Sequence, residues 1–238
     1  MKQLKFGVTL SAASILIAGA VLSGAIAAET KKEATPATKQ VAPPAGAPNV
    51  TETQPTAQVD GFRSARFGMT EAEVKAVIAK DFGLKGDAVR EQPNAAERTT
   101  VLLIKVPDLL PGGGTAEVSY VFGYESKKLI QVSVAWSKAT DDKMTPEQLF
   151  SNSSVLRSHF LSEGFRPDTI ATNMPMNNGV LIFRGSDAKD HTAMLMLQGT
   201  LEQAQNKDQR VLTPTALLLF YVADAKAPDI YRLPAGSF

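Results

Sequence analysis

Four methionines are the residues whose type and spacing most readily support chemistry in this chain. Met174 and Met176 flank a proline, and Met194 and Met196 lie two residues apart in a strand-like run. Thioether sulfur is the soft ligand that copper(I) prefers, so the four form a candidate copper site if the 174–176 segment folds over the later strand. His191 would not join them, because alternation along a strand turns it to the opposite face. The alternative is that these flexible side chains fill gaps in the core.

Other catalytic patterns are incomplete. Ser186 and Lys189 have the spacing of a nucleophile and its base, but that pair needs a helix to bring the two side chains together. Here they lie in a polar link that we expect to be a solvated turn between strands. The glycines at 112–114 precede a strand, so they lack the helix N-terminus that phosphate sites use. We therefore predict no enzyme activity and no cofactor.

Composition excludes further classes of protein. The 238 residues include no cysteine, which excludes disulfides, cysteine-ligated zinc and a lipid anchor on an N-terminal cysteine. The 25 basic residues nearly balance 24 acidic ones, so nothing indicates binding to nucleic acid. Only His159 and His191 are present, too few for a three-histidine metal site.

The first 27 residues are typical of a signal peptide. Lys2 and Lys5 precede an uncharged run from Phe6 to Ala28, and small residues at 25 and 27 predict cleavage before Ala28. The alternative is an uncleaved anchor, because the uncharged run could span a hydrocarbon core of about 30 Å. We expect a periplasmic or secreted protein that contacts the membrane only if the anchor is kept.

Residues 28–61 are predicted to form a disordered linker before a folded domain at 62–238. Five of the 14 prolines fall in this linker, and the first aromatic residue after Phe6 is Phe62. Such a composition buries too little apolar surface to offset the entropy of ordering.

The folded domain is predicted to contain two similar halves, 62–138 and 139–238. Thr70 with Glu73 forms a capping box that begins a helix, and Thr145 with Gln148 forms a second one 75 residues later. Three strand-like runs follow each helix. They are 101–106, 116–122 and 130–136, and then 180–184, 192–198 and 212–222. We predict an α+β fold of two αβββ repeats, with helices on one face of an antiparallel sheet.

The other face of this sheet is the predicted binding surface. Alternation places Glu117, Ser119, Gln131 and Ser133 away from the helices. We expect a broad polar face there that contacts another protein. The run at 216–222 is apolar on both sides, which indicates either a central strand covered above and below or an exposed apolar patch for a partner.

The run from Phe67 to Val74 (FGMTEAEV) resembles the helix start of small envelope proteins. These are the SmpA/OmlA-type lipoproteins and proteins of the β-lactamase-inhibitor-protein-like fold, in which an α-then-β unit can occur twice. The resemblance covers about eight residues and implies a non-catalytic protein that presents a sheet face to a partner. Two features depart from it, because this chain has neither a lipobox cysteine nor cysteine pairs.

The sequence as a whole predicts an exported, non-catalytic binding or scaffold protein of the bacterial cell envelope, with another envelope protein as its partner. The alternative is a periplasmic carrier of a small ligand or of copper that uses the four methionines.

Overall fold

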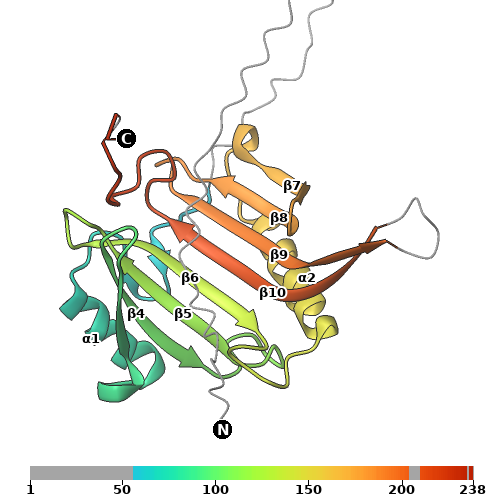
Figure 1. Cartoon of the computed structure of the whole chain (residues 1–238), viewed down its shortest axis with the longest axis horizontal. Coiled ribbons are helices and arrows are strands. Elements are labelled where there is room, and N and C mark those ends of the chain that lie inside the picture. The colour runs from blue at the N-terminus through green and yellow to red at the C-terminus, as the bar shows by residue number, and fades with distance from the viewer. Residues whose placement is uncertain (1–55, 204–209, 235, 238) are drawn as a thin grey trace, which may run out of the picture.

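The computed structural model describes residues 56–203, 210–234, 236 and 237. They form one eight-stranded antiparallel sheet with two helices packed against it, which confirms the predicted α+β class (Figure 1). Among the described residues, no helix is long and apolar enough to cross a membrane. The predicted signal peptide and most of the predicted linker lie outside the described residues.

Each half of the chain contributes one helix and four strands. The first half contains α1 (Glu71–Phe82), β3 (Arg90–Asn94), β4 (Thr99–Val106), β5 (Ala116–Phe122) and β6 (Leu129–Ser137). The second contains α2 (Pro146–Ser162), β7 (Ala171–Met176), β8 (Gly179–Ser186), β9 (Thr192–Gln203) and β10 (Arg210–Val222). A 3₁₀ turn follows each helix, at Gly86–Ala88 and Pro167–Thr169, and the two-residue strands β1 (Gly61–Phe62) and β2 (Ala65–Arg66) precede α1. The expected order of a helix followed by three strands therefore gains an edge strand in each half.

The strand order β3-β4-β5-β6-β10-β9-β8-β7 places the two halves side by side. Each half is a meander of neighbouring strands, and the last strand of each half pairs with the last strand of the other. This β6–β10 pairing runs from Gln131 opposite Val222 to Ser137 opposite Ala216. Both outer strands contain a proline, Pro93 in β3 and Pro175 in β7. Proline suits an edge because it has no N–H to give to another strand.

Both helix starts are capped as predicted. The Thr70 hydroxyl accepts a hydrogen bond from the Glu73 backbone N–H, and the Glu73 carboxylate accepts one from the Thr70 N–H at 2.7 Å. Thr145 and Gln148 form the same reciprocal pair at α2. Gly83 ends α1 with φ +70°, a left-handed conformation that glycine adopts without strain.

The main core lies between the helices and one face of the sheet. Val74 and Ile78 of α1 and Leu149 and Phe160 of α2 are buried against it. The only tryptophan, Trp136 on β6, is 1% exposed in this core. In Figure 1 the sheet is seen from its opposite side, with α2 behind β9 and β10. We call that opposite side the helix-free face.

Candidate functional site

The helix-free face carries the four polar residues that the sequence assigns to it. Ser119 on β5 lies directly opposite Ser133 on β6, and Gln131 lies two pairs further along, opposite Val121. Glu117 lies opposite Ala135 and forms an ion pair of 2.9 Å with Arg90 on β3. The strands therefore bring all four residues into one patch near the middle of the sheet.

Two apolar clusters flank this polar patch, so the expectation of a broadly polar face is only partly met. One cluster lies over β4 to β6 and contains Val101, Leu103, Val121 and Ile130. The other lies over β7 to β10, and its buried members are Leu181, Met196, Phe220 and Val222. They arise because these strands carry apolar residues at successive positions, on both sides of the sheet. No described helix packs on either cluster.

Gln131 has the least satisfied polar side chain in the patch. It is only 2% exposed, and its Nε2 has no hydrogen-bond partner among the described residues. A buried donor without an acceptor costs about 1–3 kcal/mol. Gln131 also lines a cavity of about 100 Å³, together with Val222, Asp224 and Pro228. The helix-free face thus contains an amide donor directed at no described acceptor.

The C-terminal segment borders one end of this face. Asp229 accepts hydrogen bonds of 2.9 Å from the backbone N–H groups of Glu125 and Ser126. Burial alone would raise the pKa of Asp229, but the hydrogen bonds from Ser126 and the backbone outweigh burial and hold it below its usual value. The guanidinium of Arg98 lies 3.6 Å from the centre of the Tyr231 ring. These contacts fasten the segment to the β3–β4 and β5–β6 turns.

The structure places the four candidate copper ligands near the second apolar cluster. Met196 is buried in it, and Met176 and Met194 pack against it. Met174 is 52% exposed and pairs with Leu181, which in turn pairs with Met196 across β8. The four therefore share one region of the helix-free face, and copper(I) binding stays a prediction.

His191 lies on the other face, as the alternation predicts, but in an arrangement that the sequence did not indicate. It belongs to the turn between β8 and β9, where its Nδ1 is 3.6 Å from a carboxylate oxygen of Asp187 and 3.6 Å from one of Asp60. The Lys189 ammonium donates to the same Asp60 oxygen at 2.8 Å, and this hydrogen bond is the main reason that the pKa of Asp60 is lowered.

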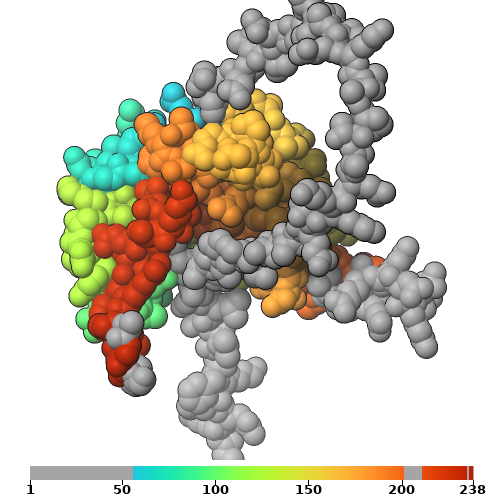
Figure 2. Space-filling model, turned by 90° about the horizontal axis from the view of Figure 1, so that it is seen from above, coloured from blue at the N-terminus to red at the C-terminus, as the bar shows by residue number. Residues whose placement is uncertain are grey.

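The expectation of a solvated turn holds for residues 188–190, which are exposed, but not for Asp187. Its side chain is 3% exposed and accepts hydrogen bonds from the backbone N–H groups of Lys189, His191 and Val59, at 2.8, 3.0 and 2.9 Å. The bond to Val59 joins residues 128 positions apart, so no local pattern could have predicted it. Figure 2 shows the β8–β9 turn (orange) beside the first described residues (cyan).

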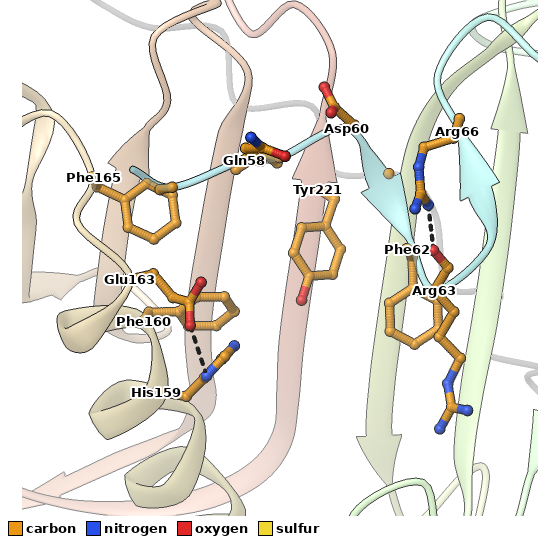
Figure 3. A pocket seen from close by; sticks show the side chains of 13 residues that line it. Gln58, Asp60, Phe62, Arg63, Arg66, His159, Phe160, Glu163, Phe165 and Tyr221 are labelled. Carbon is orange, nitrogen blue, oxygen red and sulfur yellow. Dashed lines mark hydrogen bonds and ion pairs between the residues drawn. The ribbon is translucent and has the colours of Figure 1, made fainter. Parts of the chain in front are cut away.

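A cavity of about 240 Å³ opens next to this turn, between α2, β10 and residues 57–66 (Figure 3). The Phe62 and Tyr221 rings stack with centroids 5.8 Å apart, and Phe160 contacts Tyr221 edge-on. Burial, with a smaller effect from Glu163, raises the pKa of Tyr221 to about 12. His159 Nδ1 lies 3.4 Å from a carboxylate oxygen of Glu163 at the cavity mouth, and the His159 side chain is 55% exposed, as expected for a helix-surface residue.

Comparison with family models, with curated proteins and with solved structures finds no match to this chain. The fold therefore defines only the structural class of the protein, which is α+β with an eight-stranded antiparallel sheet and helices on one face. The resemblance to SmpA/OmlA-type proteins remains a prediction carried by residues 67–74.

Proposed function

We propose that this chain is an exported, non-catalytic binding protein of the bacterial cell envelope, whose helix-free face receives an apolar segment of another envelope protein. The proposal rests on one observation: two apolar clusters flank a polar patch on a face that no described helix covers. The signal-like first 27 residues and the linker that follows support export.

The chemistry of the face indicates what the partner must supply. Leu103 and Phe220 are only 6% and 4% exposed, so apolar side chains of the partner would pack mainly on the partly buried members of the two clusters, such as Ile130, Met194 and Leu218. Burial of that apolar surface would favour binding. Gln131 Nε2 has no acceptor among the described residues, so the partner would supply one opposite the patch, such as a backbone carbonyl. An amphipathic segment with one acceptor between two groups of apolar side chains fits these requirements.

Site-specific photo-crosslinking in the source cells tests this proposal. A photoreactive residue replaces Ser133, which is half-buried in the polar patch, and in a control it replaces Ala76, which is exposed on α1. We expect a discrete protein adduct from position 133 only, mapped by mass spectrometry to an apolar segment of the partner. We also expect Ala135→Arg, on the same face, to abolish that adduct without changing the thermal unfolding temperature.

Three results would contradict the proposal. One is equal crosslinking from positions 133 and 76, and another is an adduct that survives Ala135→Arg. The third is an adduct whose mapped position in the partner is a charged surface. Export is tested separately by cell fractionation, which should recover the chain in the periplasmic or secreted fraction. The mass of the recovered chain then shows whether it was cleaved before Ala28.

A further inference from the structure

We propose that Asp60, Asp187 and His191 form a binding site for a divalent cation of the zinc type. The site joins the β8–β9 turn to the segment that precedes β1. It lies on the opposite face of the sheet from the proposed partner surface, so it goes beyond the proposed function and stands or falls independently of it.

The distances among the three side chains fit a tetrahedral metal ion. Zinc binds carboxylate oxygen and imidazole nitrogen at about 2.0–2.2 Å, so two ligand atoms of one tetrahedron lie about 3.3–3.6 Å apart. His191 Nδ1 is 3.6 Å from Asp60 Oδ1 and 3.6 Å from Asp187 Oδ2. All three ligand atoms lie within 4.8 Å of one another. Only a small movement would close the remaining distance between the two carboxylates.

The imidazole nitrogen supplies a second observation, independent of the carboxylates. His191 Nδ1 is buried and has no hydrogen-bond partner in the described part of the chain, because 3.6 Å is too long for a hydrogen bond to either carboxylate. The ring is held in place by an edge-on contact with Phe67, at 5.2 Å between centroids. A buried imidazole nitrogen that lies 3.6 Å from an oxygen of each of two carboxylates is an arrangement that a metal ion would satisfy.

The surroundings also hold the ligands in place. Three backbone N–H groups donate to Asp187 and fix its orientation, as outer partners do for metal-binding carboxylates. Among the described residues, Asp187 Oδ2 accepts one hydrogen bond, from the Val59 N–H, which leaves a second lone pair for a metal ion. Asp60 and His191 are 33% and 21% exposed, so an ion and a water ligand can reach the site from solvent.

The positive charges nearby decide how tightly an ion can bind. Lys189 already places an ammonium on Asp60, but its side chain is 63% exposed and can move into solvent when an ion displaces it. Arg66 acts on Asp60 only through its charge. Asp190, on the same turn, is occupied by Arg166 and Lys226. Lys189 is therefore the direct competitor of a bound metal ion.

Titration of the full chain, purified and freed of metal with a chelator, tests the site. Zinc, manganese and calcium ions are added separately, and both the heat of binding and the thermal unfolding temperature are measured. We expect one zinc ion per chain and a rise in unfolding temperature, because the ion would fasten residues 57–60 to the β8–β9 turn.

Four variants separate metal binding from a purely structural ion-pair network. Asp60→Asn and His191→Gln should each weaken zinc binding by about tenfold or more, and His159→Gln should leave it unchanged. Lys189→Ala should tighten zinc binding, because it removes the competing ammonium. A structural network predicts the reverse for Lys189→Ala, namely lower stability and no gain in affinity. Circular dichroism checks that each variant is folded.

If a variant fails to fold, X-ray absorption at the zinc edge of the zinc-loaded, unsubstituted chain still tests the site. Nitrogen and oxygen neighbours alone, about four in number, support the site. Sulfur neighbours would place the zinc at the methionines and overturn the proposal. So would the absence of saturable binding for all three ions, or equal losses in His159→Gln and His191→Gln.

Discussion

Replacing Gln131 by methionine should stabilise the isolated domain, which is unusual for a change at a buried position. The Gln131 amide is 2% exposed and its Nε2 lacks an acceptor, so folding leaves a desolvated donor unpaired. Methionine has a similar length and no donor, so the substitution removes a cost of about 1–3 kcal/mol. We expect a gain of about 1 kcal/mol, equivalent to a rise of about 2–4 °C in unfolding temperature for a domain of this size.

Asn152 provides the matched control, because it is a buried amide with a partner. It is 5% exposed, and its Nδ2 donates to the carbonyl of Gly113 at 2.9 Å. Asn152→Leu removes that bond and leaves the carbonyl buried without a donor, so we expect a loss of about 1–3 kcal/mol. The two substitutions should therefore change stability in opposite directions.

Urea unfolding followed by tryptophan fluorescence measures both changes. Trp136 is the only tryptophan and is buried in the main core, so its emission reports global unfolding. If Gln131→Met destabilises the domain as much as Asn152→Leu does, the Gln131 amide is satisfied in solution. Gln131 would then need no acceptor from a partner, contrary to the proposed function.

The remaining predictions concern local features. Thr145→Ala should lower the free energy of unfolding, measured by urea titration, by about 1 kcal/mol, because it removes the N-cap of α2. A loss of less than about 0.3 kcal/mol would contradict this prediction. Hydrogen bonds from two backbone N–H groups lower the pKa of Asp141, so its stabilisation is present above its unfolded pKa near 4 and is lost as pH falls below that. Asp141→Asn should therefore flatten the acid side of a plot of unfolding temperature against pH, and Asp142→Asn should not. Replacing Met194 and Met196 together by leucine should abolish copper(I) binding, and an unchanged copper titration would remove the copper alternative.

The helix ends and most strands follow from rules that act over a few residues. Capping boxes at Thr70 and Thr145 involve side chains and N–H groups three positions apart, so the sequence contains the whole interaction. Polar and apolar residues alternate clearly along β5 and β6, because the polar patch lies on one face of these strands. These features could be predicted without knowledge of the fold.

The edge strands β3 and β7 were not predicted from the sequence, and their exposure explains why. Most of their residues are exposed on both sides, as in the run from Arg90 to Pro93, so they show no apolar alternation. Each also contains a proline, which argues against a strand when position in the sheet is unknown.

The contacts around Asp187 illustrate what local patterns cannot contain. A short polar stretch between two strands looks like a solvated turn, and residues 188–190 are exposed as expected. Asp187 is buried instead, with its carboxylate bonded to the distant Val59 N–H. On the helix-free face, the run at 216–222 indicated an apolar patch only as one of two alternatives, and the cluster around Leu103 was not predicted. Apolar residues at successive positions indicate two covered faces, but they do not say what covers the second one.

The strand order has a consequence for how the domain folds. Every neighbouring pair within a half joins strands that are adjacent in the chain, so each meander can form from short loops. The β6–β10 pairing instead joins residues such as Val134 and Leu219, which are far apart in sequence. Closing so long a loop costs entropy before any contact repays it, so this central pairing should form last. The β6–β10 pairing at the middle of the sheet would then form only after the strands within each half have paired with one another.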